Sequence, residues 1–199
     1  LDLELQLRRK GIHTVQYVGP SVWAWRRYRL RKVARAAERV LVLFPFEQAI
    51  YDAAGIPCTH VGHPLADEIA LEPDRGPARQ RLGLDAGATV VALLPGSRRA
   101  EIRQHAALFL QTADWVARQC PEARFVVSLR DQPGLELVRA EISRLRLGRL
   151  PVQLHCNRTH DALAAADTAV VASGTVTLEA LLFKCPMVVA YRMHPVSYH

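Results

Sequence analysis

The sequence has none of the long apolar segments that mark a membrane-spanning or secreted protein. No apolar run in its 199 residues approaches the ~18 that span a bilayer, and the longest candidate, residues 40–46, is interrupted by Pro45. Residues 1–4, Leu-Asp-Leu-Glu, do not resemble a signal peptide. The four cysteines lie far apart, and no two have CxxC spacing. This distribution of cysteines favours a reduced, cytosolic compartment.

The common nucleotide and metal fingerprints are also absent. There is no Walker motif and no GxGxxG. Cys58, His60 and His63 offer three possible zinc ligands, and Cys58 and His60 would share one face of a strand. No second ligand cluster accompanies them. We therefore expect no metal and no cofactor.

What the sequence does contain is a globular composition with an excess of positive charge. Half of the residues are hydrophobic, 23% are charged, and the net charge is +7. A basic balance favours anionic partners, which include nucleic acid, acidic lipid and phosphorylated small molecules, but it does not choose among them.

Strand and helix patterns alternate along the chain. Such alternation predicts an α/β fold with parallel sheets and helices on both faces. Residues 62–77, rich in proline, read as a linker with at most a short helix around 65–70. We expect two incomplete Rossmann-like domains, 1–68 and 69–199. The predicted strands are 14–18, 40–44, 58–61, 89–94, 124–129, 152–154, 168–172 and 188–191, and the predicted helices are 26–39, 47–54, 101–119, 135–145, 161–166 and 176–183.

The stretch LLPGSRRAEI, residues 93–102, places a glycine turn between a buried strand and a long helix. Ligands of open parallel sheets bind beyond the carboxyl ends of the strands. Gly96 would let a ligand approach the backbone, next to Ser97, and Arg98 would add a charge-assisted contact to phosphate. The alternative is a tight turn with a solvent-facing arginine.

A second strand–glycine–helix turn lies in ASGTVTLEA, residues 172–180. Ser173 and Thr175 bring hydroxyls to it, Gly174 gives the backbone room, and Glu179 offers a carboxylate for sugar hydroxyls. The alternative is that Ser173 or Thr175 caps the helix and Glu179 is an ordinary exposed helix residue. Both turns would face the same crevice of one sheet.

A third stretch combines aromatic and basic residues. Trp23 and Trp25 precede residues 26–39, which hold seven basic side chains and one acid. The pattern fits a solvated basic face, a nucleic-acid surface or an anionic membrane surface. Composition does not separate these three interpretations.

Four long phrases resemble the lipid-A-disaccharide synthase family and occur in the family's order over nearly the whole chain. They are YVGPSVWAWR, LFPFEQAIYDAAGIPCTHVGHPLAD, LLPGSRRAEI and ASGTVTLEALLFKCPMVVAYRMHP. The resemblance implies an inverting glycosyltransferase of GT-B architecture that needs no metal. It would transfer 2,3-diacylglucosamine from UDP to 2,3-diacylglucosamine 1-phosphate, forming a β-1,6-linked disaccharide and UDP at the cytoplasmic face of the inner membrane.

The resemblance also implies site residues. The turn at Gly96, Ser97 and Arg98 would meet the diphosphate, and Glu179 would hold the ribose. Other residues that it places at the UDP-sugar site are Ser173, Gly174, Thr175, Tyr191, Arg192 and Met193. Residues that it places on the acceptor and membrane side are Trp23, Trp25, Arg27, Arg31, Lys32 and Arg35.

No catalytic group is assigned within these residues. The resemblance places the family's glycine-rich turn and catalytic acid before Leu1, and a returning segment after His199. It thus implies that the chain is a central part of the enzyme and inactive alone. The rival interpretations are another GT-B UDP-sugar transferase or epimerase of peptidoglycan type, and a nucleic-acid-binding module built on residues 23–39. We expect no nucleic-acid partner, because that module leaves both glycine turns unexplained.

Overall fold

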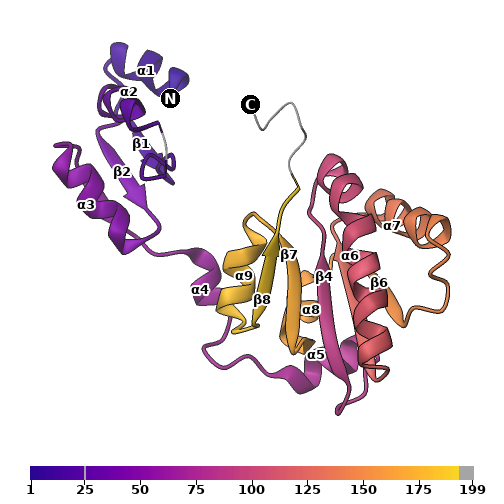
Figure 1. The fold of residues 1–199 in the computed structure, drawn as a ribbon. Coiled ribbons are helices and arrows are strands. Elements are labelled where there is room, and N and C mark those ends of the chain that lie inside the picture. Colours follow the sequence, from indigo (N-terminus) through magenta and orange to yellow (C-terminus); the bar gives the residue numbers. More distant parts are fainter. Residues whose placement is uncertain (25, 193–199) are drawn as a thin grey trace. The chain divides into compact units, whose positions relative to one another are not determined.

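The computed structural model describes residues 1–24 and 26–192, which form two compact α/β units (Figure 1). The first unit is Leu1–Glu68, and the second begins at Ile69. Trp25 and Met193, both expected at functional surfaces, lie outside the described residues.

The first unit is built on a parallel three-stranded sheet in the order β1-β2-β3. Val40 and Val42 alternate with more exposed residues along β2 and pack with Val33 and Tyr51 in one apolar cluster. Burial raises the pKa of Tyr51 to about 12. The elements are α1 (Asp2–Arg9), β1 (Val15–Tyr17), the 3-10 helix η1 (Arg27–Arg29), α2 (Leu30–Ala36), β2 (Arg39–Val42), α3 (Pro45–Ala53), β3 (Cys58–His60) and α4 (Pro64–Glu68).

The second unit is built on a parallel five-stranded sheet in the order β6-β5-β4-β7-β8. The chain therefore moves outward from β4 in one direction and then returns to the other side of it. The elements are α5 (Arg75–Leu82), β4 (Thr89–Leu94), α6 (Arg99–Gln119), β5 (Ala123–Leu129), α7 (Gln132–Arg144), β6 (Val152–Cys156), α8 (Thr159–Ala165), β7 (Thr168–Ala172), α9 (Val176–Leu182) and β8 (Met187–Ala190).

Strand β4 is buried on both faces, which explains its uninterrupted apolar sequence. Val90 and Ala92 pack in a core with α5, α8 and α9, whereas Val91 and Leu93 pack in a second core with α6 and α7. Figure 1 shows these helices covering the two faces of the sheet. The expected parallel sheet with helices on both faces is confirmed in this unit.

Two helices were not predicted. Helix α5 begins at Arg75, inside the range 62–77 that we expected to be a linker, and α1 lies in a segment with no predicted element. The predicted helix 26–39 is also shorter, because it starts as η1 and ends at Ala36, after which Ala37 is extended. Among residues 1–24 and 26–192, no helix is long and apolar enough to cross a bilayer.

Candidate functional site

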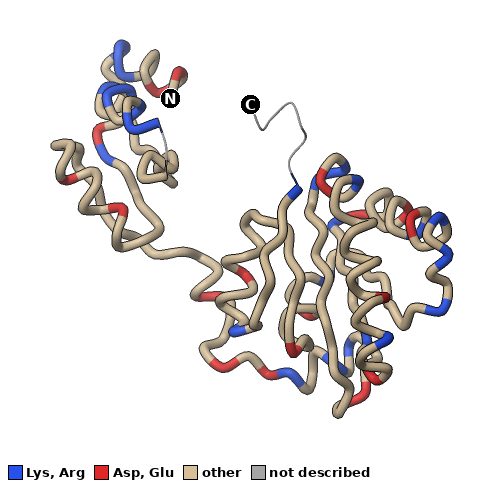
Figure 2. Tube along the Cα trace, viewed as in Figure 1, with Lys and Arg blue, Asp and Glu red and all other residues tan. Residues whose placement is uncertain are grey.

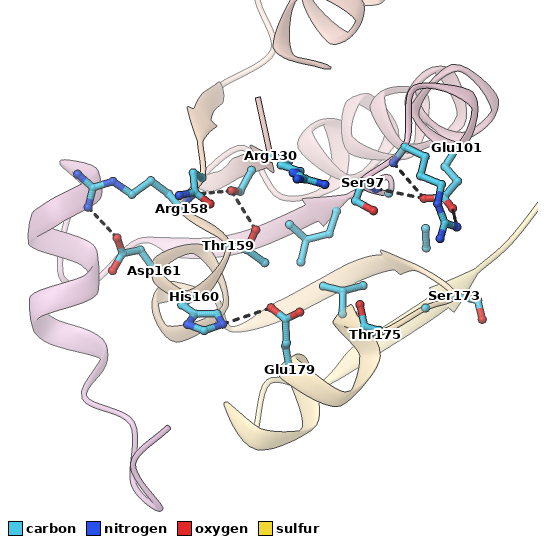
Figure 3. A pocket seen from close by; sticks show the side chains of 18 residues that line it. Ser97, Glu101, Arg130, Arg158, Thr159, His160, Asp161, Ser173, Thr175 and Glu179 are labelled. Atoms are coloured by element: carbon cyan, nitrogen blue, oxygen red, sulfur yellow. Dashed lines mark hydrogen bonds and ion pairs between the residues drawn. The ribbon is translucent and has the colours of Figure 1, made fainter. Parts of the chain in front are cut away.

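A cavity of about 680 Å³ lies at the carboxyl edge of the second unit's sheet (Figure 3). Its walls come from the ends of β4, β5, β6 and β7 and from the starts of α6, α8 and α9. The strand order reverses between β4 and β7, and such switch points are where open parallel sheets bind ligands. The volume suits a small molecule of nucleotide size.

The turn between β4 and α6 is held by one carboxylate. The backbone N–H groups of Ser97 and Arg98 donate to Glu101 Oε2 at 3.2 and 3.3 Å. Gly96 has a φ of 122°, and a Cβ there would lie 2.7 Å from the Cβ of Glu101. The turn therefore requires glycine for both its dihedral angle and its close packing.

Arg98 lies at the rim of the cavity and forms an exposed ion pair. Its Nη1 is 2.9 Å from Glu101 Oε1, and its side chain is 82% exposed. Partial burial raises the pKa of Glu101, but the N–H groups of Arg98 and Ser97 and the Arg98 guanidinium outweigh this effect and lower it overall. Because an exposed pair is worth only about 0–1 kcal/mol, the guanidinium can exchange this partner for an anionic ligand.

The turn between β7 and α9 lines the opposite wall. Ser173, Gly174 and Thr175 are exposed and face the cavity. Thr175 is the N-cap residue of α9, yet no side-chain hydrogen bond caps this helix. The capping alternative for these hydroxyls is therefore wrong, and both lie at the cavity wall without holding the fold together.

Glu179 projects into the same cavity from the first turns of α9. Its side chain is 19% exposed, and its Oε2 lies 3.4 Å from Nε2 of His160 on α8. Figure 3 shows the two side chains meeting across the cavity wall. Glu179 is thus a positioned, half-buried carboxylate rather than an ordinary exposed helix residue.

Several polar residues of the cavity escaped the sequence analysis. The side chain of Arg130, after β5, has no hydrogen bond or ion pair with any described residue. After β6, the N–H of Arg158 donates to Ser128 Oγ at 3.0 Å, and its guanidinium pairs with Asp161 at 2.9 Å. The sequence signal for these residues is their position after the carboxyl ends of β5 and β6, the same signal that identified the other two turns.

Tyr191 and Arg192 do not line the cavity. They follow β8, and the N–H of Arg192 donates to Nε2 of His105 at 3.0 Å. Their link to the site therefore runs through His105 of α6. Met193, which was also expected at the UDP-sugar site, lies outside the described residues. Within residues 1–24 and 26–192, no group of three or more His, Cys, Asp or Glu side chains could hold a metal ion.

The first unit carries a partly exposed aromatic cluster, which we define as Trp23, Phe44 and Phe46. Trp23 is 49% exposed and meets the Phe46 ring edge-on at 5.4 Å, and Phe44 stacks on Phe46 at 5.6 Å. Phe44 and Phe46 follow the carboxyl end of β2. Trp23 is therefore not a buried core residue.

Basic residues gather on the same unit, on α1, η1 and α2 (Figure 2). Arg27, Arg31 and Arg35 are exposed. Lys32 is partly neutralised, because its Nζ lies 2.7 Å from Asp2 Oδ1. Three of the four predicted basic contacts are thus open to an anionic surface.

Comparison with known sequences places the chain in one family. A profile of the family described as lipid-A-disaccharide synthetase matches residues 1–199. The lipid-A-disaccharide synthase of Pseudomonas syringae pv. syringae is 50% identical over 199 residues, which are all of this chain and 51% of that protein. The enzyme of the same name from Azoarcus sp. is 45% identical over 198 residues. The chain spans about half the length of the curated relatives it matches.

Solved structures of low sequence identity share the fold. A co-structure of S. aureus MnaA with UDP has a TM-score of 0.64 at 11% identity, covering 94% of this chain and 52% of that one. Anabaena Alr3699/HepE in complex with UDP and glucose gives 0.54 at 20% identity, covering 94% and 55%. WaaG, a glycosyltransferase involved in lipopolysaccharide biosynthesis, gives 0.53 at 16% identity, covering 94% and 62%. These likenesses confirm the expected GT-B-type α/β fold.

Proposed function

The chain belongs to the lipid-A-disaccharide synthetase family, and on this premise we propose that it provides the sugar-nucleotide site of a glycosyltransferase. The reaction transfers 2,3-diacylglucosamine from UDP to 2,3-diacylglucosamine 1-phosphate and yields lipid A disaccharide 1-phosphate and UDP. We assign no catalytic base among the residues of this chain.

One observation carries the proposal: a single cavity brings together two turns that lie about 75 residues apart in sequence, both named by the family resemblance. Arg98 and Arg130 supply charge-assisted donors for the diphosphate. Ser173 and Thr175 add hydroxyls that the fold does not use. The N–H groups of Ser97 and Arg98 already serve Glu101, so side chains rather than this backbone supply the donors.

Glu179 takes the ribose in this proposal. A carboxylate accepts two hydrogen bonds from neighbouring hydroxyls, and His160 at 3.4 Å keeps Glu179 directed into the cavity. The MnaA and HepE structures, which share this fold, are complexes with UDP. The uridine diphosphate part of the donor is therefore the part that this cavity suits best.

The acceptor side is proposed to be the first unit. The aromatic cluster offers apolar area for acyl chains, and Arg27, Arg31 and Arg35 offer positive charge for phosphate and for acidic lipid. We propose that this surface works at the cytoplasmic face of the inner membrane and that the protein has no nucleic-acid partner. The mixture of aromatic and basic groups suits a bilayer interface.

The experiment is UDP calorimetry with the protein at its full natural length. Arg98→Ala should weaken UDP binding roughly ten- to a hundredfold, because a charge-assisted contact is worth ~1.5–3 kcal/mol. The matched control is Arg103→Ala, an exposed arginine of the same helix that does not line the cavity. Equal UDP affinity in both variants would return Arg98 to the role of a solvent-facing residue.

A second variant tests the ribose contact, and a product assay tests the acceptor. Wild type should bind UDP more tightly than 2′,3′-dideoxy-UDP, and Glu179→Ala should lose most of that preference.

Formation of a disaccharide 1-phosphate from UDP-2,3-diacylglucosamine and 2,3-diacylglucosamine 1-phosphate should be measurable by mass spectrometry. UDP binding without this product, but with transfer to a peptidoglycan-type acceptor, would favour the rival transferase.

A further inference from the structure

A fully buried histidine joins two segments around the cavity, and neither the reaction nor the family resemblance assigns it a role. His105 lies on α6 and has no exposed surface. Its Nδ1 is 3.0 Å from the carbonyl oxygen of Pro95, the residue before the Gly96–Arg98 turn. Its Nε2 is 3.0 Å from the N–H of Arg192, after β8. Its ring also packs on Tyr191, with centroids 5.2 Å apart.

The two partners fix the protonation pattern of the ring. The Arg192 N–H can only donate, so Nε2 must accept and carries no proton. The proton of a neutral imidazole then lies on Nδ1 and is donated to the Pro95 carbonyl. The segment after β8 thus selects the tautomer that holds the turn after β4.

We propose that His105 is a positioning residue for the sugar-nucleotide cavity: it fixes the Pro95 carbonyl and thereby the turn that presents Arg98, while the Arg192 N–H sets its tautomer. The inference rests on the proposed UDP site. Tyr191 and Arg192 do not line the cavity, but through His105 a substitution at either residue would still affect nucleotide binding.

Two amide substitutions separate the two hydrogen bonds of the ring. In His105→Asn the amide nitrogen lies near the position of Nδ1 and can still donate to Pro95, but nothing replaces Nε2. In His105→Gln the longer side chain reaches the position of Nε2 and leaves Pro95 without a donor. Because an unpaired buried carbonyl costs about 1–3 kcal/mol, loss of the donor to Pro95 should weaken UDP affinity roughly tenfold.

The experiment measures UDP affinity by calorimetry and amide exchange at Arg192 by mass spectrometry, both with the protein at its full natural length. We expect His105→Asn to stay within about threefold of wild-type affinity and His105→Gln to lose about tenfold. The Arg192 amide should exchange faster in His105→Asn and remain protected in His105→Gln. The control is His155→Gln, a half-buried histidine of β6 that does not line the cavity and should leave UDP affinity unchanged.

The outcomes distinguish the inference from the function on which it rests. Equal affinity in the Asn and Gln variants, or a better affinity in Gln than in Asn, would overturn the positioning role, even if both variants melt at lower temperature. Wild type that does not bind UDP would overturn the proposed function together with the inference. A loss that appears in Gln alone, in a folded protein, supports the inference.

Discussion

Two glycines of the cavity are needed for different physical reasons. Gly96 has a φ of 122° and no room for a side chain, since a Cβ would lie 2.7 Å from the Cβ of Glu101. Gly174 has open space where a Cβ would be, and its φ is not positive. The fold therefore requires the first glycine, whereas only a ligand would require the second.

Alanine substitutions should separate these two requirements. Gly96→Ala should destabilise the protein by ~1–3 kcal/mol, the usual cost of a strained backbone, and lower its urea midpoint. Gly174→Ala should leave the midpoint unchanged but weaken UDP binding, because its methyl group lines the cavity. Wild-type UDP affinity in a folded Gly174→Ala protein would show that the β7–α9 turn does not approach the nucleotide.

Glu101 makes the β4–α6 turn sensitive to acid. Its pKa is lowered in the folded protein, so its stabilising effect is present above the unfolded glutamate value of ~4.3 and is lost as pH falls through the folded pKa. The free-energy difference between wild type and Glu101→Gln should therefore stay constant from about pH 7 to about pH 5.5 and shrink as pH falls below ~4.3, towards the folded pKa. Urea unfolding at several pH values measures it, with exposed Glu136→Gln of α7 as the control. A difference that does not change with pH would contradict the carboxylate's role.

At the scale of elements, the strands of the second unit were predicted almost to the residue, and the reason is their burial. Strands β4 and β7 were placed at 89–94 and 168–172, the ranges that the structure shows, because both are short apolar runs bounded by polar turns. Helix α5 was missed, since its sequence RGPARQRL is charged and contains Gly76 and Pro77. The signals were nevertheless present: Asp74 caps its N-terminus by accepting from Gly76 N–H at 2.9 Å, and Gly83 ends it with a φ of 65°.

The two turns of the site were predicted from the sequence, whereas the role of His105 was not, because its partners are distant in the sequence. Each turn is local, so its glycine and polar residues could be recognised in a short window. The role of His105 depends on Pro95 and Arg192, which are 10 and 87 residues away, and a histidine on the apolar face of a helix resembles an ordinary core residue. Arg130 was missed because a single arginine after a strand resembles a solvated surface residue.

Helix α5 is fixed to the sheet by a buried arginine, Arg79, which pairs with the partly exposed Asp167. Arg79, of which 6% of the side chain is exposed, pairs with Asp167 at 3.0 Å and donates from Nε to Ala165 O at 3.1 Å. Asp167 also accepts from the N–H of Val90 at the start of β4. Helix α5, which the sequence analysis missed, therefore attaches through these polar contacts in addition to the apolar packing of Ala78 and Leu82.

Removal of Arg79 should cost more stability than removal of a surface arginine on the same helix. Arg79→Ala should cost about 1–3 kcal/mol, because it leaves the buried Ala165 carbonyl without its donor, while the partly exposed Asp167 keeps its contact with Arg75. Arg81→Ala, whose pair with Asp161 is half exposed, should cost at most about 1 kcal/mol. Urea unfolding compares them, and equal losses would show that Arg79 is not an anchor of α5.

At the scale of the whole molecule, the net charge of +7 has two possible meanings. It can act as a general field that attracts any anionic surface, or it can act through a basic face on η1 and α2, which we define as the exposed Arg27, Arg31 and Arg35. Only the second meaning gives the protein a defined membrane contact. The two meanings differ in one measurable respect, which is whether the location of the charge matters or only its amount.

Vesicle co-sedimentation of the protein at its full natural length separates them. Wild type should bind acidic vesicles better than neutral ones, since a basic residue near an acidic surface contributes about 1 kcal/mol. Replacement of Arg27, Arg31 and Arg35 by glutamate should remove most of that preference. Added salt should have the same effect, because exposed charges are screened within ~10 Å at 0.1 M.

The decisive comparison is a second triple variant with the same change in net charge. Arg103, Arg139 and Arg149 are exposed arginines of the second unit, and their replacement by glutamate leaves the first unit untouched. If the basic face on η1 and α2 makes the membrane contact, this control should keep most of the preference for acidic vesicles, and circular dichroism should show both variants folded. Equal losses in the two triple variants would mean that net charge alone drives the binding. If net charge alone drives binding, Trp23→Ala should leave the binding to neutral vesicles unchanged. If the first unit forms a defined interface, loss of this half-exposed ring should weaken that binding.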